Sequence, residues 1–205
     1  PKPSGTWPPY WRAVCYRLHT PAAARSLSDL FREKRMASLQ TLHVEVNGQP
    51  QVRSVAPRQH LVDFIRNELG LKGSHLGCEH GVCGACTVEV NGRIVRGCLT
   101  LAVQAQGGKV RTIEGLSADG DVRDLQDAFV RNNALQCGFC TPGMVMAAKE
   151  LLEAKPDATR EEVREWMSGN YCRCTGYHAI VDAICETLAE RAKNASSRPS
   201  EKVSA

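Results

Sequence analysis

Four cysteines in the second half of the chain occur as two close pairs. Cys137 and Cys140 have two residues between them, and Cys172 and Cys174 have one. Gly138 permits the tight turn that would direct both thiols of the first pair to one centre, and residues two apart on an extended segment point to the same side. Paired thiols are typical of a metal site. Zinc held by four cysteines has a similar pairing, whereas a pair of structural disulfides fits the spacing less well.

The first half of the chain carries a more specific cysteine pattern. Cys78, Cys83 and Cys86 are spaced C-x4-C-x2-C, and Cys98 follows further on. This order is the one that plant-type 2Fe-2S ligation uses. Glycines within residues 77–84 would let the backbone wrap closely round an inorganic core and direct amide N–H groups at its sulfurs. A zinc knuckle does not need such a wrap, so the pattern favours an iron–sulfur cluster.

The same loop contains two histidines, which are possible ligands because Rieske-type centres hold one iron with two histidines. Four thiols complete the site without His75 and His80, so we expect both to be loop or neighbouring residues. Cys185 falls at an apolar helical position and is expected to be a buried thiol. The chain has neither a G-x-G-x-x-G after a strand for flavin binding nor a convincing set of nucleophile, base and orienting residue. We therefore expect the catalytic residues on another chain.

The charge of the chain is unevenly distributed. The formal net charge is +4, but residues 1–35 alone carry +5 and the remainder carries −1. The globular part therefore offers no footprint for a nucleic acid, and no apolar run is long enough to span a membrane. Ten cysteines in tight clusters, with no signal peptide, indicate metal ligation in a reducing compartment. We therefore expect a cytoplasmic protein.

Composition also divides the chain. Residues 1–37 are rich in Pro, Ala, Arg and Ser and are predicted to be a disordered leader. The leader is similar in composition to an organellar transit peptide, but Met36 stands just before the first convincing strand, so we favour a translation start at Met36 over a targeting role. The rest divides into a domain at 38–114, a second at 120–192 and a flexible tail at 193–205.

The first thiol set requires strands to position it. Alternating apolar residues predict a hairpin of 41–46 and 51–55 around an Asn-Gly turn, followed by a helix at 60–69. Further strands are predicted at 87–90, 93–95 and 110–113.

The second thiol set requires helices. Residues 114–121, with two glycines, are predicted to be a linker. Helical periodicity then predicts four helices with short connections, which is the pattern of a bundle. A Thr cap with Glu162 three residues on begins one of them, and Met144, Met146 and Met167 are expected in the core. The predicted helices are 121–131, 144–154, 159–167 and 178–191.

Three segments carry a family resemblance: GCEHGVCGACT at 77–87, QCGFCTPG at 136–143 and GNYCRCTG at 169–176. Residues 38–192 resemble the small iron–sulfur subunit of the molybdenum hydroxylases, the family that includes xanthine dehydrogenase, aldehyde oxidoreductase and aerobic carbon monoxide dehydrogenase. The resemblance implies an α+β fold with a β-grasp, plant-type ferredoxin-like domain followed by a four-helix bundle, each holding one 2Fe-2S cluster. The implied ligands are Cys78, Cys83, Cys86 and Cys98 for the first cluster, and Cys137, Cys140, Cys172 and Cys174 for the second.

The same resemblance implies an electron-transfer subunit of an oxidoreductase, in a heterotrimer with a large molybdopterin-binding subunit and a medium FAD-binding subunit. Electrons would pass from molybdopterin, expected in a dinucleotide form, through the helical-domain cluster and the ferredoxin-like cluster toward the flavin. Gln136 stands where the family has a glutamine that hydrogen-bonds the pterin. The substrate could be carbon monoxide, an aldehyde, a purine or another N-heterocycle, because the molybdenum chain sets the specificity.

Two rival functions stay open at this point. One is a free two-cluster ferredoxin that diffuses between redox enzymes. The near-neutral core lacks the charged docking surface that such carriers tend to use. The other is a zinc-stabilised interaction module, which a colourless protein would indicate.

Overall fold

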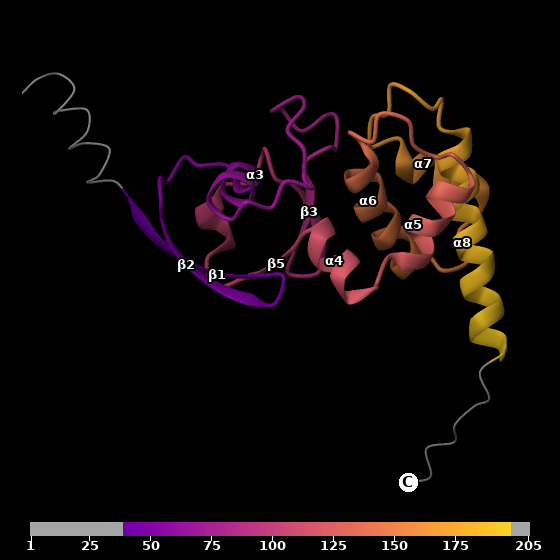
Figure 1. The fold of residues 1–205 in the computed structure, drawn as a ribbon, viewed down its shortest axis with the longest axis horizontal. Helices are drawn as coiled ribbons and strands as arrows, with labels where there is room; N and C mark the ends of the chain where they lie inside the picture. The colour runs from indigo at the N-terminus through magenta and orange to yellow at the C-terminus, as the bar shows by residue number, and fades with distance from the viewer. Residues whose placement is uncertain (1–38, 198–205) are drawn as a thin grey trace, which may run out of the picture. The chain divides into compact units, whose positions relative to one another are not determined.

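The computed structural model describes residues 39–197, whose elements are labelled in Figure 1. The predicted leader at 1–37 and the end of the predicted tail, 198–205, lie outside these residues. Within the described residues, no helix combines the length and the apolar character that crossing a membrane requires.

A five-stranded sheet of order β2-β1-β5-β3-β4 forms the base of the first half. Strands β1 and β2 are antiparallel and meet at the predicted turn, where Asn47 and Gly48 have φ of 50° and 75°. Asn and Gly tolerate such positive φ, which two-residue hairpin turns require. Strand β5 runs parallel to β1 and antiparallel to β3, which forms a hairpin with β4. The predicted strands are present, as β1 Gln40–Val46, β2 Gln49–Val55, β3 Thr87–Val90, β4 Arg93–Arg96 and β5 Lys109–Arg111.

A short helical segment packs on this sheet. Where one α-helix is predicted at 60–69, helix α3 (Leu61–Asp63) runs directly into a π-helical turn, η1 (Phe64–Glu68). Phe64 and Ile65 are fully buried in the cluster that also holds the inward side chains of the strands. Burying side chains of this size contributes about 1.5–3 kcal/mol each, which fixes the segment that precedes the first cysteine loop. A 3₁₀ turn, η2 (Ala102–Ala105), completes this half.

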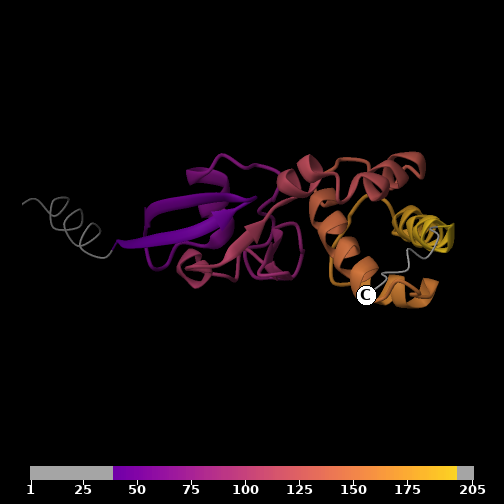
Figure 2. The ribbon, with the colours of Figure 1, turned by 90° about the horizontal axis from the view of Figure 1, so that it is seen from below.

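Helices make up the second half, and Figure 2 shows them gathered beside the sheet. Helix α5 packs against α6 and α8, and α7 packs against the same two helices. Thr159 accepts from the N–H of Glu162, whose carboxylate accepts from the N–H of Thr159, so the predicted cap is confirmed. Met144, Met146 and Met167 lie in the core as predicted. The bounds are α5 Arg123–Arg131, α6 Thr141–Ala154, α7 Arg160–Met167 and α8 His178–Ser197, so α8 continues past residue 192.

The predicted linker at 114–121 is wrong, because helix α4 occupies Ile113–Asp119. Gly115 serves close packing: a Cβ at this position would lie 2.3 Å from Oδ1 of Asn47. Gly120 ends the helix with φ of 81°, a left-handed conformation that glycine adopts without strain. The two glycines therefore reflect a packed helix and its cap, and the connection between the halves is ordered.

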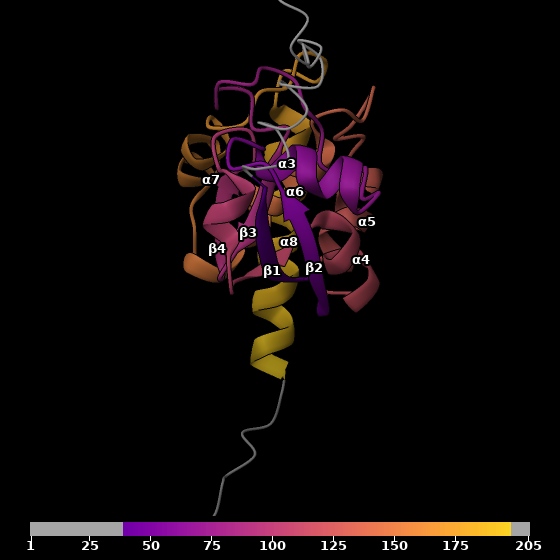
Figure 3. The same ribbon diagram turned by 90° about the vertical axis from the view of Figure 1, so that its left-hand side faces the viewer.

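Helix α6 packs on the hairpin of β3 and β4. Figure 1 places α6 beside β3, and Figure 3 looks along the same direction, with the strands in front of the helix. Its Lys149 is nearly buried, and the ammonium nitrogen lies 3.1 Å from Glu89 of β3 and 2.8 Å from Glu153. Burial lowers the pKa of Lys149, but the two carboxylates outweigh burial and raise it. Glu150 accepts from the N–H of Ile94 at 3.1 Å. Polar contacts thus hold the helical half on the sheet.

Replacing Lys149 by Met should destabilise the chain by about 3 kcal/mol, because the carboxylate of Glu89, whose side chain is only 12% exposed, would lose its counter-charge. The exposed pair of Lys155 and Glu162 supplies the control, since water screens this pair and Lys155→Met should destabilise the chain much less. Chemical denaturation of the cluster-loaded chain, followed by circular dichroism, measures both. An equal decrease in the free energy of unfolding in both variants would contradict the role given to the buried pair.

Candidate metal centres

Two loops of the helical half bring its four predicted cysteine ligands together. Helix α6 begins at Thr141, directly after Cys140, and the segment before α8 carries the other pair. Gly138 has φ of 78°, which allows the turn between the first two cysteines. As a result, the sulfur of Cys137 lies 3.6 Å from the sulfur of Cys174, although 37 positions separate them in the sequence. Both of these cysteines are exposed.

The other two helical thiols are more enclosed and form a second pair. Burial raises the pKa of Cys140 to about 12, and a hydrogen bond with the thiol of Cys172 adds to the rise. Burial also acts to raise the pKa of Cys172, but hydrogen bonds from the Thr175 hydroxyl and from nearby backbone N–H groups lower it overall. The predicted set of four is therefore brought together as an exposed pair and an enclosed pair.

The thiols of the first half show the same division. The N–H of Cys83 points at the sulfur of Cys78 at 3.4 Å, and this bond is the main reason that the pKa of Cys78 falls to about 6. Cys86 and Cys98 are buried. Burial raises the pKa of Cys98 to about 11, and a hydrogen bond with the Cys86 thiol adds to the rise. The predicted set again forms two pairs.

These pairs suit a 2Fe-2S cluster, because four thiolates shared between two irons place two on each iron. Among the described residues, no three His, Cys, Asp or Glu side chains converge closely enough to hold a single metal ion. Next to Cys140, the hydroxyl of Thr141 is buried and has no partner within the described residues, as expected of a donor that faces a missing acceptor. A Cβ at Gly77 would lie 3.2 Å from the sulfur of Cys83. Because Gly77 has no side chain, this side of the Cys83 sulfur stays uncovered. The residues of the two thiol sets therefore fit 2Fe-2S clusters.

The histidines of the loop contact carbonyl oxygens. Nδ1 of His75 lies 2.7 Å from the carbonyl oxygen of Phe139, and the two rings stack with centroids 4.6 Å apart. Nδ1 of His80 contacts the carbonyl oxygen of Cys78. One ring nitrogen of each histidine is thus engaged with the backbone, and their assignment as neighbouring residues stays a prediction.

The two thiol loops also touch each other. The N–H of Tyr171 donates to the carbonyl oxygen of Cys83 at 2.8 Å. Asn170 is only 2% exposed, and its Nδ2 donates to the carbonyl oxygen of Gly84 at 3.3 Å. Arg96 donates from Nη2 to Oδ1 of Asn170 at 3.0 Å. The sequence did not identify Arg96 or Asn170 as site residues, and the only signal was that Asn170 belongs to a recognised motif.

Gln136 lies at the exposed edge of the helical thiol loop. Its Nε2 donates to the carbonyl oxygen of Cys174 at 3.0 Å, so the side chain bridges the two segments that supply the thiols. Within the described residues, Oε1 of Gln136 has no hydrogen-bond donor of its own. The amide can therefore brace the loop with its nitrogen and accept from another group with its oxygen.

Large apolar side chains are exposed around both thiol loops. Val82 and Leu99 are 64% and 61% exposed beside the first loop, and Leu135, Phe139 and Tyr171 are exposed beside the second. Exposed apolar side chains gathered at a site are typical of an interaction surface.

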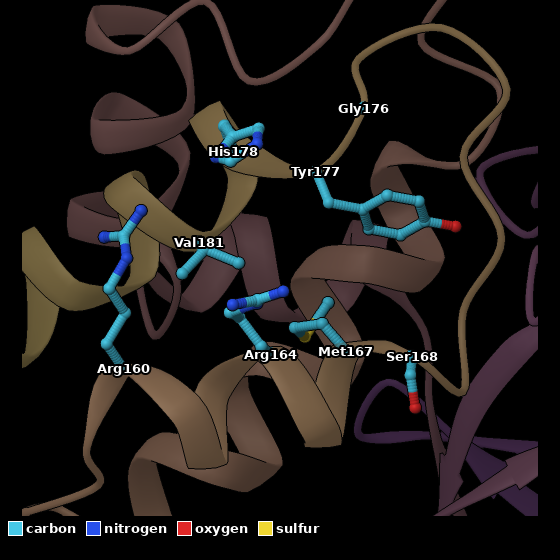
Figure 4. A pocket seen from close by; sticks show the side chains of 8 residues that line it. All are labelled: Arg160, Arg164, Met167, Ser168, Gly176, Tyr177, His178 and Val181. Carbon is cyan, nitrogen blue, oxygen red and sulfur yellow. The ribbon is translucent and has the colours of Figure 1, made fainter.

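A cavity of about 410 Å³ lies between α7 and the start of α8, and Figure 4 shows its lining. Its two arginines already have acidic partners: Arg160 lies 2.6 Å from Asp182, and Arg164 lies 3.4 Å from Glu161. Tyr177 forms the wall nearest the thiols. The cavity thus offers little unpaired positive charge for an anion, and we assign it no ligand.

Two family models match adjoining parts of the chain. The 2Fe-2S iron-sulfur cluster binding domain matches residues 44–112, and the [2Fe-2S] binding domain matches residues 112–185. Among similar proteins, the nicotine 6-hydroxylase small subunit of Paenarthrobacter nicotinovorans is 56% identical over 71% of this chain and 87% of its own length. The caffeine dehydrogenase subunit gamma of Pseudomonas sp. (strain CBB1) is 50% identical over 72% and 90%. A chain of quinoline 2-oxidoreductase from Pseudomonas putida 86 superposes with a TM-score of 0.72 at 51% identity, covering 77% of this chain and 98% of that one.

The chain is thus an iron–sulfur protein with two 2Fe-2S binding domains on an α+β fold. It belongs to the family of small iron–sulfur subunits of the molybdenum hydroxylases, which are oxidoreductases. The resemblance in the three cysteine-containing segments is confirmed.

Proposed function

We propose that this chain is the electron-transfer subunit of a molybdenum hydroxylase. The observation that carries the proposal is that eight cysteines lie in two loop regions as two sets of four, each set made of two close pairs of thiols. When bound, a 2Fe-2S cluster accepts and releases one electron at a time. The proposed ligands are Cys78, Cys83, Cys86 and Cys98 in one set, and Cys137, Cys140, Cys172 and Cys174 in the other.

The proposed architecture is a β-grasp, ferredoxin-like domain at 38–114 followed by a four-helix bundle at 120–192. The sheet order and the mutual packing of α5 to α8 support it. In this arrangement each domain supplies one complete thiol set, so one site can be altered without removing the other.

The contact between the loops supports electron transfer from one site to the other. Cys83 is a proposed ligand, and its carbonyl oxygen accepts from Tyr171, which directly precedes the proposed ligand Cys172. One hydrogen bond therefore joins the backbones of the two ligand loops. The buried Asn170 donates to the carbonyl oxygen of Gly84, and the half-buried Arg96 donates to Asn170, so both side chains support this contact. A freely diffusing ferredoxin with one cluster at each docking surface would not need such a junction.

The exposed apolar side chains beside the two thiol loops favour two separate surfaces for partner subunits. Phe139, Leu135 and the exposed Cys137 and Cys174 would face the large molybdopterin-binding subunit, and Val82 and Leu99 would face the medium FAD-binding subunit. The relatives are themselves named as small, gamma or beta subunits, which favours a multi-subunit complex. We propose a heterotrimer in the cytoplasm.

Replacing Cys83 by Ser should disturb one electron-paramagnetic signal of the reduced complex and leave the other largely intact, because the two thiol sets lie in separate domains. The unaltered chain should bind about four iron atoms. Cys185→Ser is the control, since this thiol belongs to neither set and should change neither signal. Iron near two per unaltered chain, or loss of both signals in a folded Cys83→Ser protein, would contradict the assignment.

Gln136→Ala should leave the iron content unchanged and slow the reduction of the clusters by substrate, or weaken retention of the molybdenum cofactor. The reason is that Oε1 would accept from the pterin edge while Nε2 braces Cys174. Gln126→Ala is the matched control, because that amide hydrogen-bonds Ser117 at a distant position of the helical half. Normal reduction rates with the cofactor retained would show that Gln136 only braces the loop.

The names of the relatives suggest a substrate class for the complex. Nicotine, caffeine, nicotinate and quinoline, which appear in the names of proteins 44–56% identical to this chain, are all nitrogen heterocycles. We expect quinoline or nicotinate to bleach the visible absorption of the anaerobic complex faster than benzaldehyde does. Faster bleaching by the aldehyde would place the complex with the aldehyde oxidoreductases, which are 40–43% identical to this chain.

A further inference from the structure

The sulfur of one proposed ligand, Cys172, accepts a hydrogen bond from a side-chain hydroxyl. Oγ1 of Thr175 donates to the sulfur of Cys172 at 3.1 Å. The same oxygen accepts from the N–H of Tyr177 at 3.2 Å. Because a hydroxyl has a single proton, an oxygen that accepts from Tyr177 has its proton free for the sulfur. A thiolate has no proton to donate, so with Cys172 as a cluster ligand the hydroxyl of Thr175 is the donor in this hydrogen bond.

Tyr177 holds the arrangement in place from the other side. Its φ of 71° is unusual for a large side chain, and backbone strain of this kind persists only where the surroundings enforce it. Its hydroxyl accepts from the N–H of Cys172 at 2.8 Å and donates to the carbonyl oxygen of Asn170 at 3.2 Å. Figure 4 shows this hydroxyl pointing away from Arg160 and His178. Cys172 is thus fixed at its amide by Tyr177 and at its sulfur by Thr175.

The first thiol set lacks a comparable hydroxyl within the described residues. The donors to its sulfurs are backbone N–H groups, as at Cys78, which accepts from Cys83. A backbone donor is present whatever side chain stands there, whereas the Thr175 hydroxyl depends on one residue. The two sites therefore differ in this hydroxyl, and a single substitution at Thr175 can remove it.

We propose that Thr175 is a positioning residue that sets the reduction potential of the helical-domain site above the value its four thiolates alone would give. This inference rests on the proposed function. A bound 2Fe-2S cluster would gain one electron on reduction, and no covalent bond would form or break. Because the Cys172 sulfur would share the added negative charge, the hydrogen bond from Thr175 would stabilise the reduced state more than the oxidised state. A higher potential at this site favours removal of electrons from the molybdenum centre.

The test is a redox titration of the purified complex, monitored by the two electron-paramagnetic signals. Thr175→Val keeps the shape of the side chain and removes the hydroxyl. We expect the ratio of reduced to oxidised helical-domain cluster at a given ambient potential to fall about tenfold, which is about 59 mV for a one-electron couple. The signal of the ferredoxin-like site should titrate as before. Thr175→Ser, which restores a hydroxyl, should titrate like the unaltered protein.

Thr187→Val is the matched control, because Thr187 is a fully buried threonine of the same half whose hydroxyl donates to the carbonyl oxygen of Ala183. It should shift neither potential. Unchanged potentials in an iron-replete Thr175→Val protein would overturn the proposal. If Thr175→Val loses iron, a shifted potential in Thr175→Ser would overturn it instead. Failure of the proposed function would look different, since the unaltered protein would then lack two separate signals.

Discussion

The close contact between the two thiol loops is the constraint on which the rest of the structure depends. Gly143, at the start of α6, approaches Gly84 so closely that a Cβ on it would lie 2.2 Å from the carbonyl oxygen of Gly84. A Cβ on Gly84, whose φ is 71°, would lie 2.6 Å from Asn170. Any larger residue at either position would push the loops apart. The glycines that allow a loop to wrap a cluster thus also allow the two sites to lie side by side.

The packing behind the loops preserves this contact. The nearly buried Lys149 ties α6 to β3, and the capped helix α7 leads into the segment that supplies Asn170 and Cys172. Rigid elements therefore enter the loop contact from both halves. In the proposed function, such packing would keep the separation of the two sites constant during electron transfer. The thiols themselves differ in exposure, since Cys137 and Cys174 are exposed whereas Cys86 and Cys98 are buried.

Much of the fold and both thiol sets could be predicted from the sequence, because strand alternation, the Asn-Gly turn and cysteine spacing are local signals. The contact of Arg96 with Asn170 could not, since the two residues are 74 positions apart and the motif that contains Asn170 does not indicate its partner. Helix α4 was missed for a related reason. Gly115 suggests a flexible linker until Asn47 is known to lie against it. The π-helical turn of η1 also escaped prediction, because its apolar residues are spaced almost as in an α-helix.

The hydrogen bond between Asn170 and Gly84 also has a kinetic consequence. It joins positions 86 residues apart, so it closes a very long stretch of chain. Contacts of this kind lose much conformational entropy on forming and therefore form late in folding. During synthesis, the first thiol loop leaves the ribosome well before the residues that will cover the carbonyl oxygens of Cys83 and Gly84. The order of the chain thus leaves that loop uncovered for a time, before the second half folds against it.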